Sequence, residues 1–379
     1  MISKLPNVTT SIFTIMSKMA SDYNALNLSQ GFPNFKSDPF LIELVNKAME
    51  EGYNQYAPMP GYLELREIIS NKTTLLHSKK YNPNTEITIT AGATQAIFTA
   101  IATIINKDDE AIIFTPAYDC YGPAIELFGG ITIPVQLKAP FYKPNWEEVE
   151  DKITDKTTLV IVNTPHNPSG MIFSEDDMLH LQFLSEKYNL IVISDEVYEH
   201  IIFDGLTHYS VAKYPELASR SFIVASFGKT FHNTGWKTGY CLAPENLMNE
   251  FKKIHQYNVF SVNSPIQKAL STYLKTPEHY LSLSSFYQQK RDVFLELIKD
   301  SKFKIIPSKG TYFQMLDFSD ISNESDLLFA ERLTKDYKIA TIPTSVFNEN
   351  QEDFKQIRVC FAKTEETLIS AAKIINAIS

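Results

Sequence analysis

The middle of the chain alternates short apolar, β-branched runs with longer stretches of helical spacing. The predicted strands are Glu86–Thr90, Ala111–Phe114, Ile131–Val135, Thr158–Val162, Leu190–Ser194 and Phe222–Ala225. The helical patterns between them are Ala93–Asn106, Tyr121–Phe128, Glu147–Lys152 and Glu175–Tyr188. Strands that are apolar at nearly every position are buried on both faces. The alternation therefore predicts an α/β fold with a mostly parallel sheet that helices cover on both sides.

Beyond Pro244 the pattern becomes mainly helical. The predicted helices are Met248–Tyr257, Ile266–Lys275, Tyr280–Asp300, Leu327–Tyr337 and Glu365–Ile378, and the predicted strands are Phe303–Ile306, Tyr312–Asp317 and Gln356–Phe361. This mixture indicates a smaller second domain, joined to the first within a helix near residues 280–290. We expect Met1–Ala20 to be a surface arm that packs on the body or on a second subunit.

Charge and composition exclude several classes of function. The formal net charge is −9, which argues against a nucleic acid as the main partner. No run of about 18 apolar residues occurs, so we expect no membrane-spanning helix. Cys120, Cys241 and Cys360 are far apart and form no C-x-x-C pair, so neither a metal site nor a disulfide framework is indicated. We expect a cytoplasmic enzyme that acts on small molecules.

Two charged residues lie where predicted strands end. Lys229 closely follows Phe222–Ala225, and Asp195 ends another apolar run. Ligands bind where the carboxyl ends of such strands open a crevice, and a partly desolvated lysine there has a lowered pKa and can form an imine with an aldehyde. Ser226 and Lys237 could bind an anion beside it, and Asp195 could face a cation or a protonated ring nitrogen. The alternatives are a turn with solvated lysines and an aspartate that caps the next helix.

Three further segments carry polar groups to the same region. In Asn163–Gly170, two prolines and a glycine fix a turn that would hold the Asn167 amide, while His166 is expected to be a turn residue. Small residues in Thr90–Gln95 would let an anion approach the N-terminus of a helix. Arg358 lies in an apolar strand, where it could hold a carboxylate through two parallel hydrogen bonds. An internal ion pair is the alternative for this arginine.

Together these segments resemble the class I, fold-type I aminotransferases that depend on pyridoxal 5'-phosphate (PLP), and their motifs are similar to the methionine and kynurenine branch. The motifs are AGATQAIF, TPAYDCYGP, NTPHNPSG, SDEVYEH, SFGKTFHNTGWKTGY and FSVNSP. The resemblance covers nearly the whole chain and implies a mostly parallel seven-stranded sheet with helices on both faces, plus a smaller α+β domain. It assigns residues 1–45 to an N-terminal arm and part of the small domain, 46–283 to a large PLP-binding domain, and 284–379 to a small C-terminal domain.

The resemblance also implies roles for individual residues. Lys229 would bind PLP covalently and move the substrate proton, and Asp195 would keep the pyridine nitrogen protonated. Further cofactor contacts are implied for Ala93, Thr94, Tyr118, Asn167, Tyr198, Ser226, Lys237 and, from the neighbouring subunit, Tyr56. Substrate contacts are implied for Gly31, Phe32, Asn167 and Arg358. Many class I enzymes have an arginine in place of Lys237, but a lysine also binds phosphate as a point charge.

The implied reaction moves an amino group from an amino acid to a 2-oxo acid, in a homodimer with shared active sites. No good candidate for a second carboxylate-binding arginine is found among the five arginines, so we expect methionine or another large neutral or aromatic donor. Possible walls of that pocket are Phe32, Tyr118, Phe260 and Tyr312, although core packing is the alternative for Phe32 and Tyr312. Kynurenine aminotransferase or cysteine-conjugate β-lyase activity fits the same residues. A non-catalytic PLP-binding regulator is disfavoured, because the resemblance begins near residue 5 and leaves no room for a DNA-binding segment.

Overall fold

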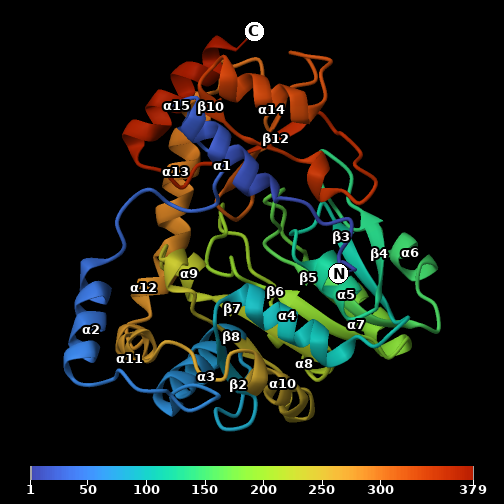
Figure 1. The fold of residues 1–379 in the computed structure, drawn as a ribbon, viewed down its shortest axis with the longest axis vertical. Coiled ribbons are helices and arrows are strands. Elements are labelled where there is room, and N and C mark those ends of the chain that lie inside the picture. The colour runs from blue at the N-terminus through green and yellow to red at the C-terminus, as the bar shows by residue number, and fades with distance from the viewer. Residues whose placement is uncertain (1, 379) are drawn as a thin grey trace.

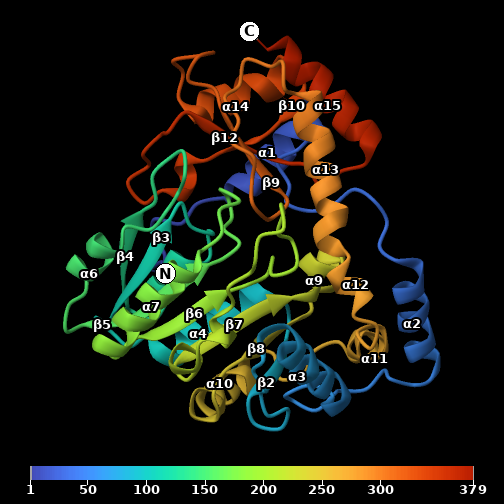
Figure 2. The same ribbon diagram turned by 180° about the vertical axis from the view of Figure 1, so that it is seen from behind.

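The computed structural model describes residues 2–378, and its centre is a seven-stranded sheet (Figures 1 and 2). The strands lie in the order β2 (Ile87–Thr90), β8 (Gly239–Leu242), β7 (Ser221–Ser226), β6 (Ile191–Asp195), β5 (Thr157–Asn163), β3 (Glu110–Thr115) and β4 (Ile131–Gln136). All pairs from β7 to β4 are parallel, and β8 is antiparallel to both of its neighbours. The predicted α/β class with a mostly parallel seven-stranded sheet is confirmed.

Side chains of the central strands alternate between two buried clusters, one on each face of the sheet. Val192 belongs to one cluster and Ile193 to the other, as expected for a strand whose successive side chains point to opposite faces. Three helices contribute to the second cluster, namely α4 (Ala93–Ile104), α5 (Tyr121–Leu127) and α10 (Glu245–Asn258). The first cluster includes residues of α3 (Leu63–His77), α6 (Trp146–Asp151), α7 (Glu175–Lys187) and α8 (Pro215–Ala218).

A second, smaller sheet lies in the upper part of the molecule in Figure 1. It consists of three antiparallel strands in the order β11 (Ile342–Pro343), β12 (Gln356–Cys360) and β9 (Phe313–Asp317). The helices α14 (Asp326–Lys335) and α15 (Glu365–Ala377) lie beside it, and α13 (Leu283–Leu297) runs between the two parts in both ribbon views. The domain bounds 1–45, 46–283 and 284–379 stay a prediction.

The N-terminal segment belongs structurally to this upper part. It contains the helix α1 (Ile12–Asp22), in which Met16 and Ala20 are buried. The following strand β1 (Leu26–Asn27) pairs in parallel with β10 (Ile339–Ala340). The predicted arm is therefore partly helical, and it packs against α14 and β10 of the same chain.

Several elements differ from the sequence-based expectation. The helices α2 (Pro39–Glu50) and α3 and the strand β8 were not predicted. Phe303–Ile306 is not a strand, because only one isolated bridge forms at Lys304, and the Gln314 side chain, not a partner strand, binds the Ile306 carbonyl at 2.8 Å. The predicted helix Tyr280–Asp300 is divided into α12 (Glu278–Leu281) and α13 at Ser282, whose hydroxyl donates to a backbone carbonyl.

The helix α2 packs against α11 (Ser264–Tyr273), and the short helix α9 (Phe227–Thr230) follows β7 directly.

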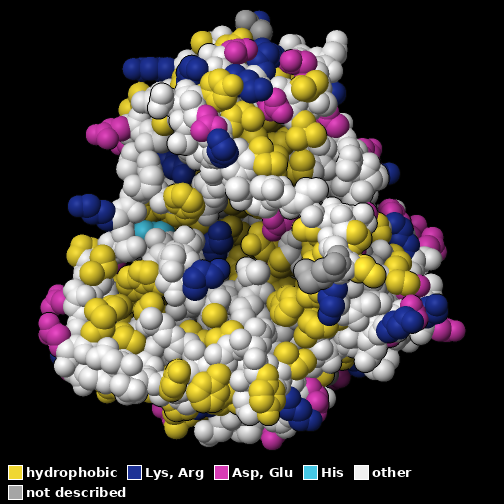
Figure 3. Space-filling view, viewed as in Figure 1, with side chains coloured by type: hydrophobic (Ala, Val, Ile, Leu, Met, Phe, Trp, Pro, Cys, Tyr) yellow, Lys and Arg dark blue, Asp and Glu magenta, His cyan; other side chains and the backbone are white. Residues whose placement is uncertain are grey.

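Figure 3 shows the molecular surface from the same side as Figure 1. This face is hollowed at mid-height between the upper and lower parts, and Lys or Arg side chains lie there beside hydrophobic ones. Among residues 2–378, no helix is both long and apolar enough to cross a membrane.

Candidate active site

Segments that are far apart in sequence meet at one edge of the seven-stranded sheet. The parallel strands β5, β6 and β7 all end there, at Asn163, Asp195 and Ser226. The antiparallel β8 begins at the same edge, because Gly239 pairs with both Ser226 and Thr90. A Cβ atom on Gly239 would lie 2.5 Å from the Ala225 carbonyl oxygen, so this close crossing requires glycine.

A cavity of about 170 Å³ opens at this edge. Nine residues that the sequence singled out line it together: Ala93, Thr94, Tyr118, Asn167, Asp195, Tyr198, Ser226, Lys229 and Lys237. The remaining lining residues are Gly92, Ile97, Asn163, Val197, Gly228, Thr234 and Thr238. The fold thus places the candidate cofactor residues around one small space, although their individual roles stay predictions.

Lys229 reaches this cavity from the first turn after β7. Ser226 caps that turn, because its Oγ accepts a hydrogen bond from the Lys229 backbone N–H at 3.3 Å. The Lys229 ammonium donates to the Gly31 carbonyl at 3.1 Å and lies 5.6 Å from the centre of the Tyr198 ring. Burial lowers the pKa of Lys229 to about 8, and the nearby positive charge of Arg358 acts in the same direction. This amine is therefore far more easily deprotonated than an exposed lysine.

Asp195 faces the same cavity, and both of its carboxylate oxygens accept hydrogen bonds. The Tyr121 hydroxyl donates to Oδ2 at 2.6 Å, and the Val197 backbone N–H donates to Oδ1 at 3.3 Å. Burial raises the pKa of Asp195 to about 6, while the hydrogen bond from Tyr121 opposes that rise. The carboxylate is thus buried but still ionised at neutral pH, which suits a partner that carries a proton or a positive charge.

A chain of polar contacts connects the sheet edge to Arg358 on β12. Asn163 donates to the Asp195 backbone carbonyl at 2.9 Å and accepts from the Asn167 backbone N–H at 2.8 Å. The Asn167 side-chain oxygen accepts from Arg358 Nη1 at 2.7 Å, and Arg358 Nη2 donates to the Ser29 carbonyl at 3.0 Å.

Arg358 is fully buried and has no acidic partner among the contacts of residues 2–378. Its guanidinium carbon lies 3.9 Å from the centre of the Phe313 ring, and its Nε atom makes no hydrogen bond within the described chain. Burial lowers the pKa of Arg358 to about 10. A buried cation without a carboxylate partner favours an anionic ligand over the alternative of an internal ion pair.

The opposite end of the cavity can receive an anion. The helix α4 begins there after Gly92, and no side chain caps its first turn. Ala93 and Thr94 are the first two helical residues, so their backbone N–H groups lack partners within the helix. Lys237 lies against Gly92, since a Cβ atom on that glycine would lie 3.6 Å from the Lys237 Nζ. The helix N-terminus and the ammonium group together provide a site for a phosphate group.

Six residues predicted for the site lie outside the walls of this cavity: Gly31, Phe32, Tyr56, Phe260, Tyr312 and Arg358. Gly31 contacts the cavity only through its hydrogen bond with Lys229, and Phe32 is half-exposed next to it. Tyr56 is 81% exposed and packs edge to face against Phe260, with ring centres 5.6 Å apart. Of the suggested substrate walls, Tyr312 is fully buried and donates its hydroxyl to the Lys229 backbone carbonyl, so in this structure it is a core residue.

Sequence reasoning missed two residues that hold the site together. Tyr121 is the first residue of α5, three residues after Tyr118, and that proximity to a candidate residue is the only signal the sequence offers for it. The sequence predicts Asn163 only as the first residue of a turn, but its side-chain amide binds the Asp195 carbonyl and the Asn167 N–H. His166 is buried, with Nδ1 2.7 Å from Ser169 Oγ and Nε2 3.0 Å from the Pro116 carbonyl, which fits the turn residue that was expected.

Comparison with known proteins gives a consistent result. The family described as aminotransferase class I and II matches residues 23–375. The chain is 46% identical to methionine aminotransferase of Escherichia coli K12, over 99% of this chain and 98% of that protein. It is 35% identical to kynurenine–oxoglutarate transaminase of Dictyostelium discoideum, over 95% of this chain and 92% of that protein. The crystal structure of YbdL from Escherichia coli, identified as having a methionine aminotransferase function, has a TM-score of 0.97 at 45% identity and covers 99% of both chains.

Proposed function

Because the chain belongs to the aminotransferase class I and II family, we propose that it is a PLP-dependent aminotransferase whose preferred amino donor is methionine or another large neutral or aromatic amino acid. The observation that carries this proposal is the convergence of Lys229, Asp195 and Lys237 on one cavity, with Arg358 beside it. The similarity to a methionine aminotransferase at 46% identity supports the choice of donor.

The residues present fit PLP. Lys229 has the lowered pKa that imine formation with an aldehyde requires, and Asp195 is an ionised carboxylate for a protonated ring nitrogen. Lys237 and the first turn of α4 form a cationic end that suits the phosphate. When bound, PLP supplies a protonated ring that accepts the electrons released at the substrate Cα.

The chain's own residues then have separate tasks. Arg358 and Asn167 bind the α-carboxylate of the substrate and so fix the direction of its Cα–H bond. Lys229 Nζ takes the proton from Cα and returns it during the reaction, for which a pKa of about 8 is well matched to neutral conditions. Asp195, held by Tyr121, keeps its negative charge and thereby keeps a proton on the ring nitrogen.

A panel of amino donors tested with several 2-oxo acids decides the donor preference. Methionine and aromatic amino acids should give the highest kcat/KM, and aspartate should be poor because the site contains no second arginine. Kynurenine belongs in the panel as the second candidate, supported by the 35% identical relative. Pyruvate formed from a cysteine conjugate in place of the transamination product would reveal β-lyase activity.

The cofactor proposal has a spectroscopic test that does not depend on activity. The purified protein should be yellow, and borohydride should fix the cofactor to Lys229, as mass spectrometry of the peptide would show. Lys229→Ala should abolish both the colour and the fixation, while Lys309→Ala, outside the cavity, should preserve them. A Lys229→Ala protein that still forms a reducible imine would contradict the assignment.

We further propose that two copies of the chain form a dimer with shared active sites, in the cytoplasm. The exposed aromatic pair of Tyr56 and Phe260 supports the dimer, because exposed rings in contact with each other are typical of an interface. The free thiols of Cys120, Cys241 and Cys360 support the compartment, because disulfides are rare in cytosolic proteins.

A further inference from the structure

A second and larger cavity, of about 540 Å³, shares no lining residue with the Lys229 cavity. It lies between segments of the two parts of the molecule, namely residues 140–143, 169–177 and 205–209 on one side and 304–309 on the other. Met315 and Asp317 of β9 and Gln356 of β12 complete the wall. Its volume is within the range of about 300–1,000 Å³ that is typical of small-molecule sites.

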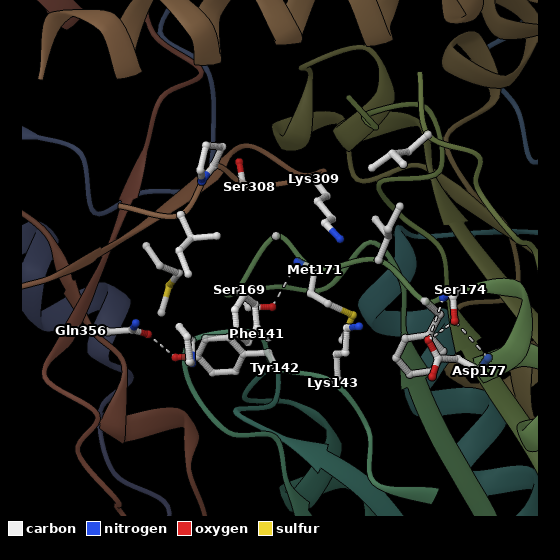
Figure 4. Close-up of a pocket in the computed structure, with 18 of the residues that line it drawn as sticks. Phe141, Tyr142, Lys143, Ser169, Met171, Ser174, Asp177, Ser308, Lys309 and Gln356 are labelled. Atoms are coloured by element: carbon white, nitrogen blue, oxygen red, sulfur yellow. Dashed lines mark hydrogen bonds between the residues drawn. The ribbon is translucent and has the colours of Figure 1, made fainter. Parts of the chain in front are cut away.

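The wall of this cavity is mainly apolar. It is formed by Phe141, Met171, Tyr209, Ile306 and Met315, together with prolines 140 and 307. Figure 4 shows the Phe141 and Met171 side chains near the centre of the group, between Gln356 on one side and Asp177 on the other. Thioether and aromatic groups of this kind form adaptable walls for a flat or branched apolar ligand.

Two cationic side chains enter the same space. In Figure 4, Lys143 and Lys309 point toward one another from opposite sides, with the Met171 side chain between them. Neither ammonium group makes an ion pair or hydrogen bond with any residue in the described range 2–378. Lys304, which also lines the cavity, differs because it binds Asp320 at 2.7 Å.

Two carboxylates also line the cavity; both are held by neutral donors and keep their negative charge. The Asp177 carboxylate accepts hydrogen bonds from Trp146 Nε1 at 2.9 Å and from Ser174 at 2.6 Å. The Asp317 carboxylate accepts from the Ser319 backbone N–H at 2.8 Å. Lys143 and Lys309 bind neither carboxylate among the described residues, and Figure 4 places Asp177 at the end of the group away from them, so the charge that complements the two ammonium groups is negative.

We propose that this cavity is a second ligand site, and that it binds an organic anion with an apolar body, such as a carboxylate or sulfonate on an aromatic or branched aliphatic group. Lys143 and Lys309 bind the anionic group, and the apolar wall covers the body of the ligand. An occupant would contact both parts of the molecule at once, because the wall is built from both. The site is separate from the proposed reaction and does not depend on the identity of the amino donor.

The test uses the PLP-loaded protein and the fluorescent sulfonate 8-anilinonaphthalene-1-sulfonate. We expect saturable binding of one probe per chain. The double variant Lys143→Ala/Lys309→Ala should raise the Kd at least fivefold, and Phe141→Ala should raise it as well. Lys253→Ala, which removes a lysine of an exposed helical ion pair, is the matched control and should leave the Kd unchanged. All these side chains are largely exposed, so their removal should leave the fold intact.

A separate variant distinguishes this site from the active site, where a carboxylate or sulfonate could also bind. Arg358→Gln should weaken substrate binding and leave the Kd of the probe unchanged. The proposal is overturned if the probe does not bind saturably, if the lysine double variant changes the Kd less than fivefold, or if Arg358→Gln displaces the probe. Failure of the donor panel described above would leave this result unaffected, so the two proposals can fail independently.

Discussion

At the scale of single residues, the lowered pKa of Lys229 leads to a direct prediction. Without PLP, reductive methylation by formaldehyde should label Lys229 with a half-maximal rate near pH 8, because burial favours the neutral amine. Exposed lysines should need a pH near their usual pKa of about 10.4. Arg358→Gln should move the midpoint of Lys229 upward, since the charge of Arg358 contributes to the shift. A midpoint near pH 10 in the unmodified protein would contradict the proposed environment.

Tyr121 gives a second prediction at this scale, because its hydroxyl stabilises the ionised form of Asp195. Tyr121→Phe should raise the pKa of Asp195 above about 6. It should also weaken PLP binding by roughly tenfold, which is the usual contribution of one hydrogen bond to a charged group. The measurement is a titration of PLP-free protein with PLP, followed by absorbance between pH 5 and 8, and the loss should be largest at the acidic end. Tyr142→Phe, whose hydroxyl binds Gln356 far from Asp195, is the matched control. Equal PLP affinity in both variants would show that Tyr121 only packs.

The positions of most candidate cofactor residues could be predicted because each lies at or just after the end of a strand. The carboxyl ends of parallel strands must meet at one edge, so Asp195 and Lys229 were placed together from sequence alone. Tyr121 could not be found in this way, since its contact with Asp195 depends on how α5 packs over the end of β6. The 3.9 Å contact of Arg358 with Phe313 likewise depends on the pairing of β12 with β9.

At the scale of secondary-structure elements, one buried ion pair connects three of them. Lys72 on α3 binds Glu199, which follows β6, at 2.7 Å, and both also contact the Tyr240 hydroxyl on β8. Burial alone would raise the pKa of Glu199, but the charge of Lys72 and its hydrogen bond hold that pKa well below its usual range. This pair stabilises the loop that carries Asp195 and Tyr198 into the cavity.

Lys72→Met should therefore lower the free energy of unfolding by about 3–5 kcal/mol at pH 7, because it removes the lysine charge that compensates a buried carboxylate and leaves the Tyr240 hydroxyl as its hydrogen-bond donor. A group with a lowered pKa stabilises the fold above its unfolded pKa of about 4.3, and this contribution is lost as the pH falls further. The difference between the two proteins in urea unfolding should thus shrink below about pH 4. Adding Glu199→Gln should recover part of the loss. A loss under about 1 kcal/mol would show that the pair contributes little.

The errors among the strands have physical reasons. The strand β8 has only four residues, so no long apolar run in the sequence indicates it. It lies antiparallel between β2 and β7. The supposed strand Phe303–Ile306 has the right composition, but the Gln314 side chain and Pro307 prevent a continuous ladder. Composition and periodicity thus predicted the parallel strands of the large sheet well, but missed the four-residue strand β8 and, among the helices, α2 and α3.

At the scale of the whole molecule, the proposed dimer can be tested at its exposed aromatic pair. Tyr56→Asp together with Phe260→Asp should convert a species of twice the 43.1 kDa chain mass into a monomer in sedimentation velocity, because buried charge opposes association. The monomer should also bind PLP more weakly if Tyr56 contributes to the neighbouring site. Phe183→Asp, at a residue of α7 that is 56% exposed, should leave the assembly unchanged. A wild-type protein that is active as a monomer would overturn the proposal.

The pairing of β1 with β10 has a consequence for synthesis on the ribosome. Because Leu26 pairs with Ile339, more than 300 residues are synthesised between β1 and its partner strand β10. At about 5–20 residues per second, this delay is on the order of tens of seconds. During that time the whole seven-stranded sheet, from Ile87 to Leu242, leaves the exit tunnel and can assemble. The segment Leu26–Asn27 therefore stays without its partner strand until synthesis has passed Ala340, long after the large sheet can form.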